Sequence, residues 1–322
     1  MRPMAKSLNG FRATLTIGWM ALGAAAVAYA RFRGVPARVA AAALAAVLVE
    51  YAFYLVPAFQ AVRERFAGWR LPPFLLAGAV LPYLACCFGA APFHWIALAR
   101  LAAVALAIGM WYLLLPRSAV TDIGFGALVA WVLLGKFLAS VYPTPYPHVE
   151  IGILGKLAVF QSAVLALMLA RRVPETGYGF LPSAREWRIG VVHFLCFVPV
   201  GLPLALGIRA VRFAKPAPLW VIVGTLLAYI WVVGLAEEFL FRGVMQPMIE
   251  QAVRNRAVGL ALTSLLFGFV HLWFRGFPNW RWVLVAGTLG WFCGHARNQA
   301  GGIRAAVVVH ALTVTAWRAF FA

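Results

Sequence analysis

Long apolar runs separated by short polar segments make up almost the whole chain. A helix needs about 20 mostly apolar residues to cross a bilayer, because unpaired backbone N–H and C=O groups are too costly in hydrocarbon. About eleven runs approach this length, and they lie near 13–30, 39–60, 71–90, 93–115, 123–141, 151–170, 189–208, 219–246, 257–274, 281–296 and 303–322. The pattern therefore predicts an all-α fold, a polytopic transmembrane helical bundle of about 11 spans, within a range of roughly 8–12.

The composition agrees with lipid as the surrounding solvent. Hydrophobic residues make up 64% of the 322 positions and charged residues only 11%, whereas an ordinary soluble domain has about 25% charged residues. We therefore expect an integral, multi-pass membrane protein that contacts membrane lipid.

The formal charge of +19 does not indicate nucleic-acid binding, because the basic residues collect at the ends of apolar runs. Arg63, Arg65 and Arg70 follow one run, and Arg171 with Arg172 follows another. Basic residues at helix ends set membrane orientation and contact lipid headgroups. No nucleic-acid partner is expected.

The charges of the connections predict which of them share a side of the membrane. Segments 88–94 and 142–148 contain neither lysine nor arginine, whereas 63–70 and 171–188 are rich in arginine. The positive-inside rule places the first pair outside and the second pair inside. Two basic segments do not fit this scheme, 31–38 and 209–215.

The polar connection 171–188 divides the chain into two groups of helices. Residues 1–170 form an N-terminal group of transmembrane helices with no assigned role, and 189–322 form a C-terminal helical core that carries the dense chemistry.

The first group does contain isolated ionisable residues within or near apolar runs: Glu50, Arg100, Lys136 and Lys156. A charge inside the membrane is a functional candidate unless it snorkels or is paired. We interpret these four as structural, with Glu50 as the one to inspect.

The strongest local signal is a pair of adjacent carboxylates, Glu237 and Glu238, inside the apolar string Gly234–Gly243. A charge at the centre of a membrane helix costs about 2.5–3.5 kcal/mol, so a partner must offset it. Arg242 lies one helical turn after Glu238 and suits a carboxylate–guanidinium pair. Glu237 is rotated by about 100° from Glu238 and stays free to act as a general base on water. A purely structural Glu–Arg pair is the alternative.

Two histidines lie on later apolar runs. His271 follows Phe267 by one turn, with the small Gly268 between them allowing close helix approach. His310 lies on the last run. If the helices bring Glu237, His271 and His310 to one interior, these side chains can polarise a water molecule or bind a divalent metal such as Zn²⁺.

These residues resemble the motifs of the CPBP family, the type II CAAX prenyl proteases and bacteriocin-processing proteins also called Abi. The family pattern is EExxxR, then FxxxH, then HxxxN or HxxxD, on separate membrane helices. Glu237 to Arg242 fits the first motif, Phe267 to His271 fits the second, and His310 matches the histidine of the third. The resemblance covers roughly residues 190–322, and the string GLAEEFLFRG is similar to bacterial members.

The resemblance implies an intramembrane protease whose first motif glutamate activates water. By this resemblance Glu237 is the base, and His271 and His310 are ligands or stabilisers of the water or of a possible Zn²⁺. Glu238 and Arg242 form the supporting pair. The implied partners are membrane lipid and a membrane-embedded or lipid-modified peptide substrate, and the implied location is the bacterial cytoplasmic (inner) membrane.

The third motif departs from the family at one position. Val314 stands where asparagine or aspartate is expected, so one hydrogen-bonding group is missing; the loss of one such donor costs about 10²–10³ in rate. Thr313 or Thr315 is a candidate replacement.

Two other interpretations stay open. One is a membrane scaffold or immunity-type protein with the same fold and weakened catalysis. The other is a transporter that uses Glu237 and Glu238 as proton or cation ligands.

Overall fold

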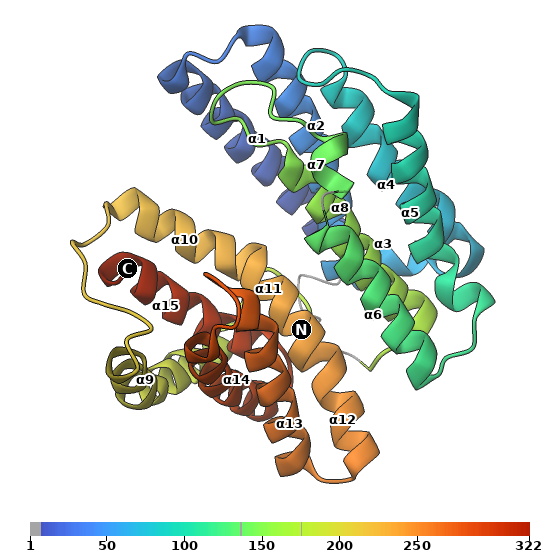
Figure 1. Cartoon of the computed structure of the whole chain (residues 1–322). Coiled ribbons are helices and arrows are strands. Elements are labelled where there is room, and N and C mark those ends of the chain that lie inside the picture. The colour runs from blue at the N-terminus through green and yellow to red at the C-terminus, as the bar shows by residue number, and fades with distance from the viewer. Residues whose placement is uncertain (1–7, 136, 175) are drawn as a thin grey trace. The chain divides into compact units, whose positions relative to one another are not determined.

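The computed structural model describes residues 8–135, 137–174 and 176–322, so Lys136 lies outside the described residues. The chain divides into two compact units, Met1–Val173 and Pro174–Ala322, with the boundary inside the polar connection 171–188. Every regular element in the described residues is a helix (Figure 1), apart from two isolated β-bridges. The prediction of an all-α fold is confirmed.

The described residues of the first unit form eight α-helices, with short 3-10 turns between some of them. The α-helices are α1 (Leu8–Arg33), α2 (Ala37–Leu55), α3 (Gln60–Arg63), α4 (Leu71–Cys86), α5 (Trp95–Leu114), α6 (Ala119–Leu134), α7 (Phe137–Val141) and α8 (Gly152–Leu165). A π-helical segment, η5 (Ala166–Arg171), continues α8 to the end of the unit.

Seven α-helices lie in the described part of the second unit, and three of them belong to one helical stretch, Leu219–Val253. The α-helices are α9 (Ala184–Gly207), α10 (Leu219–Trp231), α11 (Val233–Glu238), α12 (Gln246–Val253), α13 (Arg256–Phe269), α14 (Trp280–Ala300) and α15 (Arg304–Phe320). The π-helical segment η6 (Phe239–Met245) joins α11 to α12, and the 3-10 turn η7 (Val270–Trp273) extends α13. α15 packs beside α10 (Figure 1).

Eight helical stretches of the described residues are long and apolar enough to cross a membrane, which agrees with a polytopic bundle. The other predicted runs are helical as well, but shorter or more polar. α6 has 16 residues and α15 has 17, while α14 has 21 but carries His295, Arg297 and Asn298 in its last two turns. Helix length alone therefore does not decide how these three sit in lipid.

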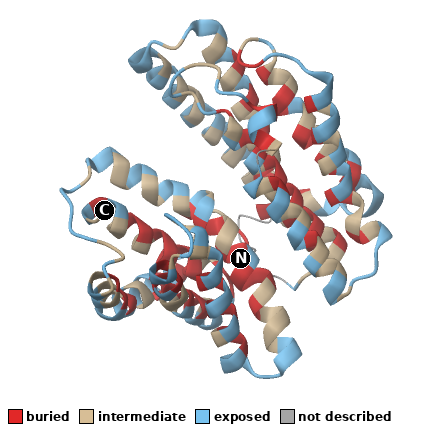
Figure 2. Ribbon diagram, viewed as in Figure 1, coloured by how far each residue is buried: buried red, intermediate tan, exposed pale blue. Residues whose placement is uncertain are grey.

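Buried residues lie on the faces that the helices of each unit turn toward one another, and the outward faces are exposed (Figure 2). The exposed faces carry large apolar side chains, such as Ile17, Trp131 and Leu195. A soluble protein rarely exposes apolar surface on this scale, whereas lipid-facing helices require it.

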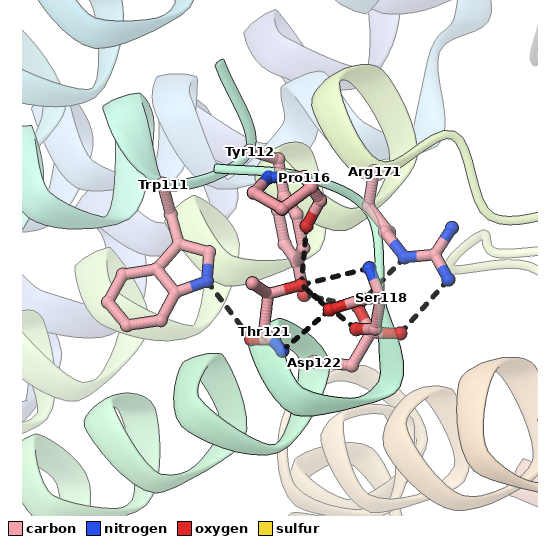
Figure 3. A network of polar contacts seen from close by, with 7 residues as sticks. All are labelled: Trp111, Tyr112, Pro116, Ser118, Thr121, Asp122 and Arg171. Atoms are coloured by element: carbon pink, nitrogen blue, oxygen red, sulfur yellow. Dashed lines mark hydrogen bonds and ion pairs between the residues drawn. The ribbon is translucent and has the colours of Figure 1, made fainter. Parts of the chain in front are cut away.

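Asp122 is the centre of a network of polar contacts in the first unit (Figure 3). Asp122 near the start of α6 accepts hydrogen bonds from the Tyr112 hydroxyl at 2.9 Å and from Arg171 Nε and Nη2 at 2.8 and 2.9 Å. Ser118 and Thr121 form a capping box at the same helix start. The bidentate pair thus joins α6 to η5, and the Tyr112 hydrogen bond joins α5 to α6.

Glu50 occupies the interior of the first unit. Its side chain is only 1% exposed, and neither carboxylate oxygen has a hydrogen-bond partner among the described residues. The interpretation of Glu50 as a structural residue stays a prediction. Glu50 lies on α2 within one of the candidate spans.

Two contacts join helices of the second unit, one between α9 and α15 and one between α13 and α14. Ser183 and Glu186 form the capping box of α9, and Glu186 also accepts a hydrogen bond from Arg304 Nε at 2.9 Å, which joins the starts of α9 and α15. A Cβ on Gly268 would lie 2.5 Å from the Val283 carbonyl oxygen. α13 and α14 are therefore in backbone contact there, which confirms the expected close approach at Gly268.

Candidate active site

The helix that carries the paired glutamates is interrupted twice. α10 ends at Trp231, because the φ and ψ of the next residue, Val232, are −129° and −78° and leave the helical region, and α11 then begins at Val233. A Cβ on Gly234 would lie 2.6 Å from the Tyr229 carbonyl oxygen, so glycine is needed at this break. The π-helical turn η6 starts directly after Glu238. Such turns are rare and occur frequently at functional sites.

Glu238, the last residue of α11, is buried and contacts side chains on η6 and α15. Its side chain is fully buried, and its Oε1 lies 2.8 Å from Nδ1 of His310 on α15. Its Oε2 forms an ion pair with Nε of Arg242 at 3.2 Å. The predicted Glu238–Arg242 pair is therefore confirmed, and the structure adds His310 as a second partner. A buried carboxylate needs such partners because desolvation of an unpaired charge is very costly.

Arg242 connects Glu238 to α14. Its side chain is 1% exposed, and its Nη2 donates a hydrogen bond to the Gly290 carbonyl oxygen at 2.9 Å. A Cβ on Gly290 would lie 2.9 Å from that same nitrogen. The guanidinium also lies over the Phe267 ring, 4.4 Å from its centroid, where a cation–π contact offsets part of the cost of burial.

Glu237 has a different environment from its neighbour. Its side chain is 33% exposed, and its Oε2 lies 3.8 Å from Nε2 of His310. That oxygen has no hydrogen-bond partner among the described residues. His310 therefore stands between the two glutamates, with Nδ1 against Glu238 and Nε2 toward Glu237.

His271 is held by its own helix. Its Nδ1 lies 2.8 Å from the Phe267 carbonyl oxygen, and a carbonyl can only accept, so Nδ1 carries the hydrogen. The Phe267 ring is fully buried and packs 5.0 Å from the His271 ring and 5.7 Å from the His310 ring, measured between centroids. The Phe267 ring thus packs against the imidazole rings of both His271 and His310.

Glu237, His271 and His310 all line one cavity of about 730 Å³. Most of the other lining side chains are apolar, and many are aromatic. They include Tyr229, Phe274, Trp282 and Trp317. The structure thus brings the three predicted residues to the wall of one cavity, while Glu238 and Arg242 lie behind that wall.

The structure also defines the surroundings of Val314. Val314 and Thr313 both line the cavity, so the position expected to be polar does face the site. The Thr313 hydroxyl donates to the Val309 carbonyl oxygen at 2.9 Å, one turn back along α15. Thr315 is buried, and its hydroxyl has no hydrogen-bond partner among the described residues, but it does not line the cavity.

The donor set Glu237, His271 and His310 has the chemistry that Zn²⁺ prefers. Its geometry fits less well, because no group of three or more His, Cys, Asp or Glu side chains among the described residues could hold a metal ion. The predicted Zn²⁺ therefore gains no support from the arrangement of these side chains and stays a prediction.

Gln246 is a buried polar residue of this region that motif reasoning missed. It follows Arg242 by one turn, is fully buried, and its Nε2 donates to Glu250 Oε1 at 2.8 Å and to Asn298 Oδ1 at 3.1 Å. Glu238, Arg242, Gln246 and Glu250 recur at intervals of four, and this spacing is the signal that would have found it.

Comparison with known proteins gives one match. The family model for type II CAAX prenyl endopeptidase Rce1-like proteins matches residues 218–316, which span α10 to α15 and include all five predicted site residues. No curated protein and no solved structure matches the chain. The match covers less than half of the chain, and it supports membership of the CPBP family through residues 218–316.

Proposed function

We propose that the second unit is an intramembrane endopeptidase that hydrolyses a peptide bond in a membrane-bound or lipid-anchored substrate. Membership in the family supports a CAAX-type intramembrane protease in general. The observation that carries the finer proposal is the contrast between two adjacent glutamates. Glu237 is one-third exposed at the cavity, whereas Glu238 is fully buried and engaged by His310 and Arg242.

In this mechanism Glu237 activates the attacking water. A water molecule within hydrogen-bond reach of both Glu237 Oε2 and His310 Nε2 fits their separation of 3.8 Å. Glu237 takes one proton as the water oxygen bonds to the scissile carbonyl carbon. It then returns that proton to the leaving nitrogen as the C–N bond breaks. The products are a carboxylic acid and an amine.

The two histidines supply further polar groups to the cavity wall. Each Nδ1 faces an acceptor oxygen, that of Glu238 for His310 and that of Phe267 for His271, so each neutral ring presents an unprotonated Nε2. In this form Nε2 accepts a hydrogen bond from the water.

Glu238 and Arg242 act as positioning residues in this proposal. The Glu238 carboxylate holds His310 Nδ1, which fixes both the orientation and the tautomer of the ring. Arg242 in turn offsets the charge of Glu238 and ties it to α14 through the Gly290 carbonyl. Neither residue lines the cavity.

The apolar wall supports a substrate with an apolar or lipid-modified segment. Aromatic side chains from α9, α10, α14 and α15 line the cavity, and its few polar side chains include the candidate catalytic residues. An apolar chain gains from burial there, while the scissile peptide must reach Glu237.

Val314 favours one alternative, a weakened or non-catalytic member of the family. A valine in the cavity wall supplies no hydrogen bond where the family motif has asparagine or aspartate. A scaffold or immunity-type role would follow if wild-type protein has no turnover.

The proposed location is the cytoplasmic membrane of a bacterium, which rests on the similarity of the string around Glu237 and Arg242 to bacterial relatives. Membrane fractionation of the native host tests it, with recovery in the inner-membrane fraction as the expected result.

The proposal is tested with the full chain reconstituted in vesicles together with a library of transmembrane and lipid-anchored peptides. Mass spectrometry should detect a cleaved peptide with wild type and none with Glu237→Ala, at equal protein incorporation. No cleavage by wild type of any peptide in either class would favour the scaffold role.

A further inference from the structure

A second, polar cavity of about 440 Å³ lies at one end of the second unit. We call it the arginine cleft, and its lining residues come from the segment after α9, from the segment before α14 and from the first turn of α14. They are Arg209, Ala210, Arg275, Pro278, Asn279, Trp280, Arg281 and Trp282. Three of these eight are arginines, and none is acidic.

The fold fixes the positions of the three arginines. Arg209 and Arg275 have positive φ values of 56° and 57°, a left-handed conformation that is uncommon for residues other than glycine. Such conformations persist where the surrounding structure determines them, and they occur often at ligand sites. Arg281 Nη1 donates to the Arg209 carbonyl oxygen at 3.3 Å, which links the two segments.

No carboxylate neutralises these charges. In the part of the chain that the structure describes, Arg209, Arg275 and Arg281 form no ion pair with an acidic side chain. Arginines elsewhere in the unit do, since Arg297 pairs with Glu250 and Arg304 with Glu186. Like charges around one cavity repel, so an anion in the arginine cleft would relieve an unfavourable interaction.

Membrane orientation does not account for this cluster. α9 has the length and composition of a membrane span, so we expect the segments at its two ends to lie on opposite sides of the membrane. The segment before α9, 171–188, is already the arginine-rich one that the positive-inside rule places inside. The arginine cleft lies after α9, on the side where that rule provides no reason for basic residues.

The geometry points to a phosphate as the ligand. The guanidinium group presents paired donors that match phosphate oxygens, and basic pockets at helix ends bind phospholipid headgroups. The N-terminus of α14, a helix of 21 residues, begins at Trp280 in the arginine cleft and adds backbone N–H groups that favour an anion.

Aromatic side chains beside the arginine cleft favour a lipid as the source of that phosphate. Trp273, Phe277 and Trp280 are exposed by 67%, 62% and 55%. The rings of Trp273 and Phe277 stack with centroids 4.9 Å apart. Exposed aromatic residues are typical of the interface between membrane and water, where they lie at the level of the headgroups. We propose that the arginine cleft binds the headgroup phosphate of an anionic phospholipid.

The arginine cleft adjoins the large cavity. Binding of a lipid in the arginine cleft does not depend on proteolysis. Trp282 lines both cavities. The Arg275 guanidinium lies 5.2 Å from the Trp317 ring centroid and 5.9 Å from that of Phe274, and both rings line the large cavity. Phe274 lies 6.3 Å from the His271 ring. A headgroup bound in the arginine cleft would therefore lie next to residues that line the large cavity.

The test measures lipid retention by native mass spectrometry of the full chain in detergent. The probes are dioctanoyl phosphatidylglycerol, dioctanoyl phosphatidylcholine and inorganic phosphate. Arg254→Gln is the matched control for Arg275→Gln, because Arg254 is also exposed, also has a left-handed φ of 52°, and lies at the end of α12 outside the arginine cleft.

Wild type and Arg254→Gln should retain phosphatidylglycerol equally, and more strongly than phosphatidylcholine. Arg275→Gln combined with Arg281→Gln should lower that retention by about tenfold or more. Arg281→Lys, which keeps the charge and removes the paired donors, should give an intermediate loss and also serves as the variant to use if the double change does not fold.

Equal phosphatidylglycerol retention by wild type and the folded arginine variants would overturn the proposal. So would a thermal stabilisation of wild type by inorganic phosphate that matches that of phosphatidylglycerol at equal concentration, since the site would then bind the free anion. Displacement of bound lipid by a short peptide through its terminal carboxylate, at lower concentration than by phosphatidylglycerol, would assign the arginine cleft to peptide instead.

Discussion

His310 Nε2 lies 3.8 Å from Glu237 Oε2 in the wall of the large cavity. The other nitrogen of the ring is held at 2.8 Å by the buried carboxylate of Glu238. One imidazole thus connects a partly exposed glutamate to a fully buried one, and the two carboxylates have different environments.

Glu238→Gln should lower both stability and turnover. The change removes the charge that offsets buried Arg242, and loss of one partner from a buried pair costs about 3–5 kcal/mol. It also releases His310 Nδ1 from its carboxylate. The unfolding midpoint in detergent and the rate of peptide cleavage measure the two effects. A variant with an unchanged midpoint would show that the pair is not needed to hold the helices together.

Gly290→Ala should destabilise the protein, because its Cβ would lie 2.9 Å from Arg242 Nη2. Overpacking of this kind typically costs about 1–3 kcal/mol. Gly287→Ala is the control, since Gly287 lies one turn earlier on α14 and its Cβ would meet nothing closer than 3.5 Å. The thermal unfolding midpoint of Gly290→Ala should be lower than that of Gly287→Ala. Equal midpoints would contradict the tight fit of Arg242 against Gly290.

Val314→Asn should raise the rate of hydrolysis. It places a hydrogen-bonding side chain in the cavity wall, where one such donor contributes up to about 10²–10³ in rate. Thr313→Val should change the rate little, because that hydroxyl already donates to the Val309 carbonyl. Single-turnover cleavage assays compare both with wild type. A large loss in Thr313→Val with no gain in Val314→Asn would assign the missing group to Thr313.

Metal removal should leave cleavage intact if Glu237 alone activates the water. The described side chains include no group of three or more that could hold a metal ion, although the donor types suit Zn²⁺. Activity after dialysis against a chelator, together with the zinc content of the purified protein, provides the measurement. Loss of activity that added Zn²⁺ restores would establish the metal instead, with Glu237, His271 and His310 as the first ligands to test.

The sequence was sufficient to predict local features of the site. The interval between Glu238 and Arg242 is one helical turn, and helix geometry alone brings the two side chains together. Gly268 between apolar neighbours likewise indicated the close approach of α13 and α14. Both predictions needed only the helical period and the cost of a charge in lipid.

Contacts between helices distant in sequence could not be predicted in the same way. The bond between His310 and Glu238 joins residues 72 positions apart, and that between Arg242 and Gly290 joins residues 48 apart. Hydrophobic pattern places each residue on a helix but does not specify which helices pack together. The break at Val232 also has no strong local signal, since valine is common within membrane helices.

The most direct test of the account is the single-turnover rate of Glu237→Gln on a peptide that wild type cleaves, measured in vesicles beside its unfolding midpoint. Glu237 is one-third exposed and not part of the buried pair, so the midpoint should stay within a degree or two of wild type. The rate should fall by about 10²–10⁴, the usual contribution of a general base. A Glu237→Gln variant that cleaves at the wild-type rate would contradict the assignment of Glu237 as the residue that activates water.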